Sequence, residues 1–179
     1  QFATTGNEFK LNTNQIIEII NKTSHAISND ETRLFLNGIY FQEVDGKLRA
    51  VATDGYRLAL VETELSHNKI EALINGIIIP KKGVAELKKI AESFPDKELT
   101  ISVDESFIYL NANNQYLLAI RLIAKEYLKY QAVIPKKSSF FSFFYRSAFM
   151  NAVSRIKIMA NERSNGVKII LTENEMIVA

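Results

Sequence analysis

The chain has 179 residues and a formal net charge of +2, with 47% of its residues hydrophobic and 23% charged, the balance of an ordinary globular protein. It has no cysteine and two histidines, which excludes disulfide scaffolds and thiolate metal sites and leaves little for a histidine-rich one. No apolar run approaches the roughly 20 residues that a membrane-spanning helix needs, and no export leader opens the sequence. Composition therefore predicts a soluble, cytoplasmic protein that uses neither a metal ion nor a cofactor.

The first part of the sequence predicts one strand, one helix and three further strands. Residues 8–11 alternate polar and apolar side chains, as a half-buried strand does. Asn12 and Gln15 have the spacing of a capping box, which favours a helix that begins at once and runs over 13–28. Three strands are expected to follow, over 34–43, 48–53 and 57–64.

Two Asp-Gly pairs separate these three strands, Asp45-Gly46 and Asp54-Gly55. Asp-Gly between alternating runs favours a type I′ hairpin turn, because both central residues of that turn need a positive φ. We therefore expect a tight hairpin at each pair.

The same order of elements then recurs. A short strand over 76–80 is followed by a helix over 81–93, and three more strands are expected over 99–103, 107–110 and 116–123. Repeated β-α-β-β-β units predict an α+β fold, in which two helices lie on one side of antiparallel sheets.

A third copy begins after a break in the pattern. Residues 124–139 contain a proline and a Lys-Lys-Ser-Ser run typical of a linker, and a strand over 140–144, a helix over 145–161 and strands over 167–171 and 176–178 are expected beyond it. The predicted domains are 1–128 and 137–179, joined by a linker over 129–136. Because the sequence opens on Gln1 and stops at Ala179 within an apolar alternation, we expect it to be a piece of a longer protein.

Positive charge gathers on the predicted helices. The helix over 13–28 is neutral, those over 81–93 and 145–161 carry +2 and +3, and the rest of the chain carries −3. A shared helix face would then be basic and suited to phosphates, without aromatic clusters for stacking on bases. The alternative is that Lys and Arg are simply good formers of exposed helix, and charge alone leaves both explanations open.

Three motifs resemble one known family. Residues 36–41 read Leu-Asn-Gly-Ile-Tyr-Phe, residues 51–59 read Val-Ala-Thr-Asp-Gly-Tyr-Arg-Leu-Ala, and residues 79–87 read Ile-Pro-Lys-Lys-Gly-Val-Ala-Glu-Leu. At this spacing they resemble the bacterial sliding clamps, the beta subunits of DNA polymerase III. The resemblance implies the processivity-clamp fold, with the two complete repeats as the middle of three similar domains and the third copy as the start of the last. It also implies a non-catalytic homodimeric ring that encircles duplex DNA.

The resemblance further implies a groove on the middle domain for short peptides of the replicative polymerase, the clamp loader and repair proteins. Carried over by motif, its residues are Leu36, Thr53, Gly55, Tyr56, Arg57, Leu58, Leu128 and Val133. Apolar side chains can take a peptide's aliphatic anchors, and Arg57 can bond its carbonyls or carboxylate. From the residues alone, the leucines could equally be core, Arg57 a strand-edge charge and Gly55 a turn residue. The linker departs from the family pattern, with Leu128 in place of a proline and Ala132 in place of a basic residue.

In such a ring the helices line the central hole. The side chains expected to face DNA are Lys22, Arg33, Lys81, Lys82, Lys88, Lys89, Arg155 and Lys157. Contacts with phosphates are independent of base sequence and sensitive to salt. Because a ring holds DNA by topology, weak contacts that allow sliding are sufficient.

Two other classes of protein compete with this interpretation. An enzyme could use Asp54 beside Arg57, or His25, but aspartate is favoured in Asp-Gly turns for backbone reasons, and the sequence contains no glycine-rich phosphate loop. A protein-interaction module of the same α+β fold would have a groove and no role in binding DNA. Salt-dependent binding of duplex DNA distinguishes that module from a clamp.

Overall fold

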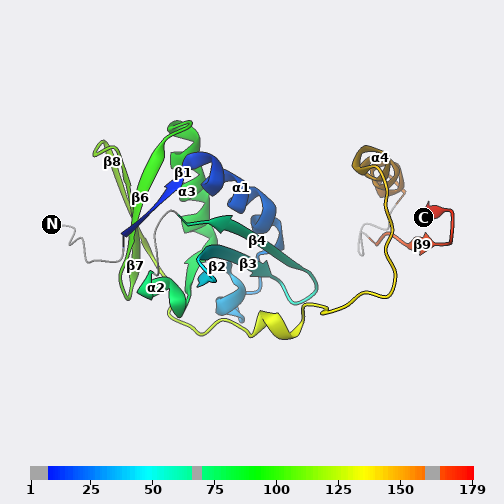
Figure 1. Cartoon of the computed structure of the whole chain (residues 1–179), viewed down its shortest axis with the longest axis horizontal. Helices are drawn as coiled ribbons and strands as arrows, with labels where there is room; N and C mark the ends of the chain where they lie inside the picture. The colour runs from blue at the N-terminus through cyan, green and yellow to red at the C-terminus, as the bar shows by residue number, and fades with distance from the viewer. Residues whose placement is uncertain (1–7, 66–69, 160–165) are drawn as a thin grey trace. The chain divides into compact units, whose positions relative to one another are not determined.

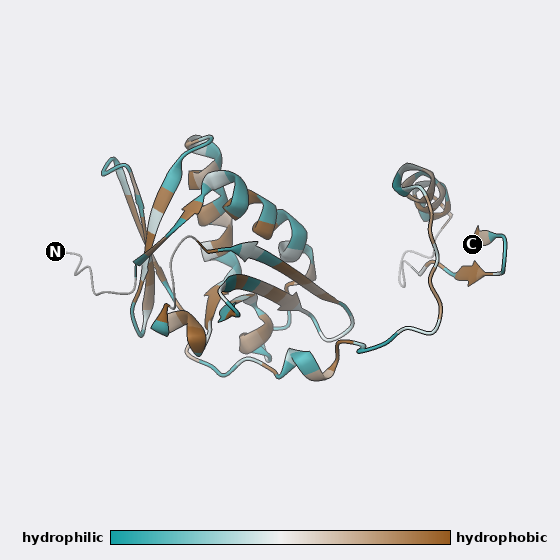
Figure 2. Ribbon diagram, in the orientation of Figure 1, coloured by the Kyte–Doolittle hydropathy of each residue, from teal (hydrophilic) through white to brown (hydrophobic). Residues whose placement is uncertain are grey.

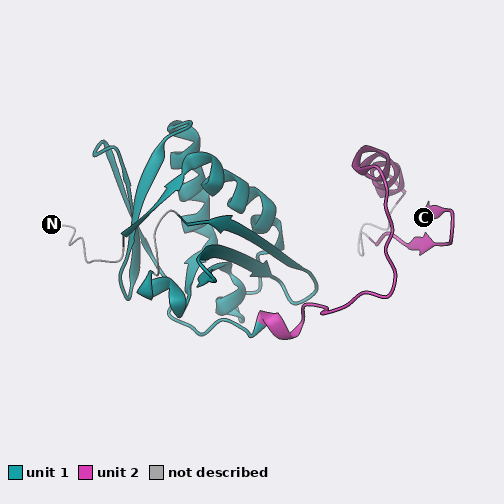
Figure 3. Ribbon diagram, in the orientation of Figure 1, with its two compact units in different colours: residues 1–129 teal, residues 130–179 magenta. Residues whose placement is uncertain are grey.

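The computed structural model describes residues 8–65, 70–159 and 166–179. The chain divides into two compact units, Gln1–Lys129 and Tyr130–Ala179, which Figure 3 draws in different colours. Each unit is described by itself below.

The first unit contains two copies of one order of elements (Figure 1). The first copy consists of β1 (Glu8–Asn12), α1 (Thr13–Thr23), β2 (Gly38–Val44), β3 (Lys47–Thr53) and β4 (Leu58–Glu64), with 3₁₀ turns at Ser24–Ala26 and Leu34–Leu36. A short helix, α2 (Glu71–Ile74), precedes the second copy, which consists of β5 (Ile77–Pro80), α3 (Lys81–Ser93), β6 (Glu98–Val103), β7 (Phe107–Ala112) and β8 (Tyr116–Arg121).

The strands form two four-stranded antiparallel sheets. Sheet I has the order β4-β3-β2-β5 and sheet II has the order β1-β6-β7-β8. Thus β1 pairs with β6 and β5 pairs with β2, so each copy contributes its first strand to the sheet of the other copy. This exchange makes one unit out of two repeats, and the predicted α+β fold is confirmed in this two-sheet form.

The core lies between the two helices and one face of each sheet. Figure 1 shows α1 and α3 side by side, and Figure 2 shows hydrophobic and hydrophilic residues alternating along β1 and β6. Ile19 of α1, Leu87 of α3 and Leu99 of β6 are almost fully buried in one cluster, as alternation in the strands and a 3.6-residue period in the helices require. Gly83 allows α3 to approach β8, since a Cβ there would come 2.4 Å from the Ile120 side chain.

Several predicted boundaries are correct and others shift for local reasons. The capping box at the start of α1 is confirmed, because the Asn12 N–H donates to Gln15 Oε1 over 2.9 Å and Asn12 Oδ1 accepts from the Asn14 N–H over 2.8 Å. The helix ends at Thr23 rather than at 28, and the Thr23 hydroxyl donates to the carbonyl of Ile19 over 2.7 Å. The type I′ turn at Asp45-Gly46 is confirmed by φ values of 52° and 78°.

The strand predicted over 34–43 begins only at Gly38. Residues 34–36 form a 3₁₀ turn because the Leu36 and Asn37 N–H groups donate back to the carbonyls of Arg33 and Leu34. A Cβ at position 38 would lie 2.2 Å from the carbonyl oxygen of Ile79, so glycine is required where β2 meets β5.

The second unit contains α4 (Arg146–Lys157) and an antiparallel hairpin of β9 (Ile169–Leu171) and β10 (Met176–Val178), after a 3₁₀ turn at Tyr130–Ala132. The strand predicted over 140–144 is wrong: the segment is not a strand, and its phenylalanines are 53% to 96% exposed. The physical reason is that a strand needs a partner, and none of the described strands pairs with this segment. The helix predicted over 145–161 is shorter, because α4 ends at Lys157 and Ile158 is its C-cap; residue 161 itself lies outside the described residues.

We predict that Gly38→Ala lowers the free energy of unfolding by about 3 kcal/mol, because the new methyl group meets backbone that cannot move without opening the β2–β5 pair. Gly46→Ala is the matched control. Its φ of 78° also disfavours alanine, but nothing lies within 4 Å of its Cβ position, so a loss of about 1 kcal/mol is expected. Urea unfolding of both variants measures the difference, and equal losses would contradict the argument.

Candidate functional site

The loop over residues 54–57 joins β3 to β4 and is fixed by its own side chains. Thr53 and Leu58 pair across its base. The Thr53 hydroxyl donates to the carbonyl of Arg57 over 2.6 Å and accepts from the Gly55 N–H over 3.1 Å. Asp54 Oδ1 accepts from the N–H groups of Tyr56 and Arg57 at 3.0 and 3.1 Å. These bonds set the loop before any ligand arrives.

The tight two-residue turn predicted at Asp54-Gly55 is wrong. Gly55 has a φ of +94°, and Asp54 is not among the residues with positive φ. The reason is the hydrogen bonding of Asp54, whose carboxylate closes a wider turn onto the two following N–H groups, as aspartate often does. These N–H groups, that of Tyr56 above all, lower the pKa of Asp54.

The loop presents two large side chains to solvent. Tyr56 is 96% exposed, and the Arg57 side chain is 62% exposed while its Nε lies 3.2 Å from Asp54 Oδ2. One nitrogen of the guanidinium is thus held by the loop, and no described residue is bonded to its Nη atoms, which can therefore donate to a ligand.

Arg33 lies against the same loop. A Cβ at Gly55 would come 3.0 Å from Arg33 Nη1, and Arg33 Nε donates to Asp30 Oδ2 over 2.8 Å. Hydrogen bonds from Thr32 and Arg33 lower the pKa of Asp30 to about 2, so this ion pair persists at neutral pH. Arg33, which was expected to face DNA, therefore lies beside loop 54–57, in the segment between α1 and β2.

Sheet I carries an apolar surface on the face turned away from the core. Residues of β2, β3 and β5 that alternate with the core positions are Tyr40, Val51 and Ile78, and all three are buried. In β4, Leu58 and Leu60 share this face and are half-buried. We call this surface the outer face of sheet I.

Leu60 was not among the predicted groove residues. Its signal in the sequence is the run Leu-Ala-Leu-Val at the start of β4, which is apolar at odd and even positions alike. A strand with that pattern has apolar side chains on both faces, and each face is expected to be covered.

The remaining groove candidates differ in exposure. Leu36 is 3% exposed, and its carbonyl accepts from the Ser28 N–H over 3.0 Å. It is therefore a buried residue of the 3₁₀ turn that follows Arg33. Leu128 is half-buried in the first unit. Val133 belongs to the second unit, where its side chain is 64% exposed.

The basic side chains of α1 and α3 fall into two groups. Lys22 pairs with Glu18 at 2.5 Å, Lys88 with Glu92 at 3.7 Å and Lys89 with Glu86 at 2.6 Å, all within one helix. Exposed pairs of this kind contribute little to stability, and they offset part of the positive charge.

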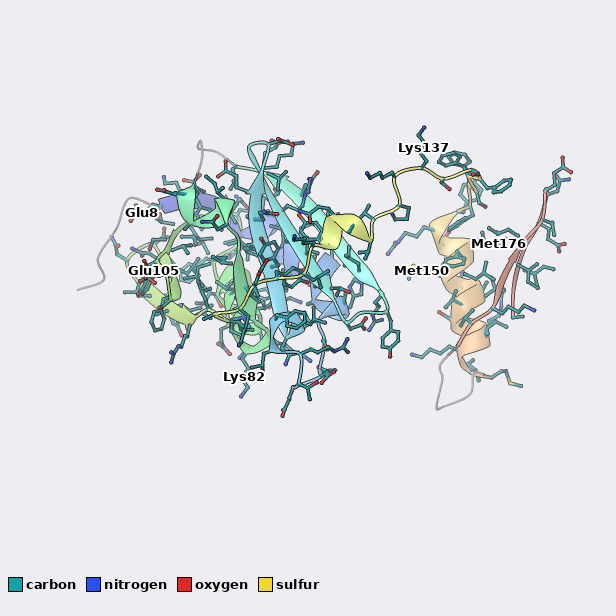
Figure 4. The ribbon with its side chains drawn as sticks, turned by 90° about the horizontal axis from the view of Figure 1, so that it is seen from below. Glu8, Lys82, Glu105, Lys137, Met150 and Met176 are labelled. Carbon is teal, nitrogen blue, oxygen red and sulfur yellow. The ribbon has the colours of Figure 1, made fainter. Side chains whose placement is uncertain are left out.

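Lys81 and Lys82 form the second group, in the first turn of α3. That turn has no acidic residue, Lys81 Nζ donates to Asn29 Oδ1 over 2.6 Å, and Figure 4 shows Lys82 pointing away from the body of the first unit. Cations at a helix N-terminus oppose the helix dipole at a cost of about 0.3–1 kcal/mol each. Helix propensity therefore does not account for these two lysines.

Arg155 and Lys157 lie exposed in the last turn of α4. Cations are favourable in a last turn, so stabilisation of the helix is a sufficient reason for these two positions.

Neither proposed catalytic residue has the surroundings that catalysis requires. Asp54 uses its oxygens to close its own loop, and its pKa is lowered rather than raised toward that of a general base. His25 is exposed in a 3₁₀ turn.

Among the described residues, no group of three or more His, Cys, Asp or Glu side chains could hold a metal ion. None of the helices in this part of the chain is long and apolar enough to cross a membrane.

Comparison with known proteins agrees with the motifs. The beta sliding clamp of Caulobacter vibrioides (strain NA1000 / CB15N) is 35% identical over 164 residues, which are 89% of this chain and 43% of that protein. The beta sliding clamp of Vibrio cholerae is 31% identical over 159 residues, which are 88% of this chain and 42% of that protein. The chain thus spans less than half the length of these relatives.

Solved structures show the same fold. The sliding clamp of Bartonella birtlesii, bound to griselimycin, matches with a TM-score of 0.85 and 31% identity, over 99% of this chain and 48% of that one. The family described as DNA polymerase III beta subunit, central domain, matches residues 10–129. The resemblance seen in the motifs is thereby confirmed, and the chain belongs to the DNA polymerase III beta subunit family.

Proposed function

We propose that this chain is part of a DNA sliding clamp, a non-catalytic processivity factor of bacterial DNA polymerase III that acts in the cytoplasm. In this assignment residues 1–128 are the middle clamp domain, 129–136 the linker and 137–179 the start of the third domain. The full-length protein would form a homodimeric ring around duplex DNA and bind the polymerase, the clamp loader and repair proteins through short peptides.

The observation that carries the proposal is the fixed loop 54–57 beside an apolar outer face. Leu58 and Leu60 offer half-buried side chains to the aliphatic anchors of a peptide. Arg57 offers donors to its carbonyls, and Asp54 keeps that arginine in place. Because the loop is ordered by its own hydrogen bonds, binding costs less conformational entropy than it would with a loose loop.

Tethering then follows from local concentration. A polymerase held by a short peptide on a ring around DNA meets the primer end again by an intramolecular encounter, at a high effective concentration. Lys81, Lys82 and the other helix lysines would contact phosphates weakly enough for the ring to slide.

We predict that the double variant Arg57→Ala/Leu58→Ala weakens binding of a Gln-x-x-hydrophobic-Leu/Phe clamp-binding peptide by about 30-fold, because it removes a charged and an apolar anchor. Fluorescence anisotropy with the labelled peptide measures the affinity. The matched control is Leu117→Ala/Arg121→Ala, an exposed leucine and an exposed arginine on β8 of sheet II. Equal affinities for the parent chain and the Arg57/Leu58 variant would remove the loop from the proposed groove.

We also predict that Lys81→Glu/Lys82→Glu weakens binding of a labelled DNA duplex and lowers the slope of log affinity against log salt by about 2, one for each lost phosphate contact. Acidic residues favour a helix N-terminus, so the loss would not come from unfolding of α3.

Lys10→Glu/Lys47→Glu is the control for charge, because both lysines pair with glutamates of the sheets, at 2.9 and 3.0 Å. An unchanged salt slope in the α3 variant would favour the alternative function, an interaction module that binds peptides and no DNA.

A further inference from the structure

Two tyrosines stack on the outer face of sheet I. The rings of Tyr40, on β2, and Tyr127, in the segment after β8, have centroids 4.5 Å apart and planes within 1° of parallel. Their exposures are 8% and 7%, although neither belongs to the main core cluster. We call this pair the tyrosine clasp.

The clasp joins residues 122–129 to the sheet. The Ile123 N–H donates to the carbonyl of Ile78 over 3.0 Å, and the Tyr127 hydroxyl lies 3.5 Å from the carbonyl oxygen of Val51. Val51 is two residues before Thr53, whose hydroxyl holds loop 54–57. Residues 122–129 and loop 54–57 are therefore both hydrogen-bonded to the same strand, β3.

Tyr40 is itself held from the other side. Its hydroxyl donates to the carbonyl of Asn75 over 3.1 Å, and a Cβ at Gly76 would come 2.1 Å from that hydroxyl oxygen. Gly76 also has a φ of +76°. The turn after α2 thus leaves space for one position of the Tyr40 ring, against which Tyr127 stacks.

We propose that the tyrosine clasp positions Leu128 as a wall of the peptide groove. Leu128 follows Tyr127 directly and is half-buried. Unlike the proline of the family pattern, leucine has no ring that fixes its own φ, so the position of Leu128 depends on how its neighbours are held. The inference rests on the proposed function and adds to it two positioning residues, Tyr40 and Tyr127. Neither needs to touch the peptide: together they keep the segment from having to be ordered when the peptide binds.

The test compares Tyr127→Leu with Tyr127→Phe in the 179-residue chain. Leucine keeps an apolar side chain and removes the stack, and we expect it to weaken binding of the clamp-binding peptide by about tenfold, the size of an aromatic pair interaction. Phenylalanine keeps the ring and should restore the affinity to within about threefold of the parent chain.

Tyr109→Leu is the matched control, because Tyr109 also has an aromatic neighbour, Phe107, with ring centroids 6.0 Å apart on β7 of sheet II. It should leave peptide affinity unchanged even where it lowers the melting temperature. Hydrogen exchange supplies a second readout: the Ile123 amide should lose protection in Tyr127→Leu and keep it in Tyr109→Leu.

A second variant tests the clasp from its other side. Gly76→Ala leaves both tyrosines in the sequence but fills the space of the Tyr40 hydroxyl. It should therefore weaken binding of the peptide and reduce the hydrogen-exchange protection of the Ile123 amide, as Tyr127→Leu does. Parent-level affinity in both Tyr127→Leu and Gly76→Ala would overturn the inference and leave the groove standing. If the parent chain binds no peptide, the proposed function is contradicted. The clasp is then tested by hydrogen exchange alone: unchanged exchange of the Ile123 amide in Tyr127→Leu would show that the clasp does not hold the segment.

Discussion

The exchange of first strands between the two repeats is the constraint on which the first unit depends. Because β1 completes the sheet of the second copy and β5 the sheet of the first, neither copy can close its own sheet. The two helices then pack over a single core, and neither helix covers the outer face of sheet I. In the second unit, residues 140–144 have strand-like composition, but no described strand pairs with them, and they form no strand.

The apolar outer face of sheet I follows from this arrangement. With the inner face occupied by α1 and α3, the alternating positions of β2, β3, β4 and β5 point away from the core and still carry Tyr40, Val51, Leu58, Leu60 and Ile78. Residues 122–129 cover one part of that face through Tyr127. Loop 54–57 adjoins it at the end of β3, with its geometry set by Thr53 and Asp54. A surface that is apolar, partly covered and bordered by a rigid loop is suited to a short peptide.

Much of this could be predicted from the sequence, where local signals decide the outcome. The Asn12–Gln15 capping box, the Asp45-Gly46 turn and the limits of α3 depend on neighbouring residues. The strand exchange could not be predicted, because alternation shows which face of a strand is apolar and not which strand lies beside it. Likewise, the position of Arg33 over Gly55 depends on a contact between residues 22 apart in the chain, which no local pattern indicates. The wider turn at Asp54 depends on competition between its carboxylate and its backbone, which the Asp-Gly pair alone does not reveal.

The central claim is that the outer face of sheet I and loop 54–57 form a peptide-binding groove. Its most direct test is the map of amide chemical-shift changes when a clamp-binding peptide is titrated into the isotope-labelled chain. We predict that the changes gather on loop 54–57, β4, Arg33 and the segment around Leu128, and that the amides on the exposed sides of α1 and α3 stay unchanged. Changes confined to α1 and α3, or to sheet II, would contradict it.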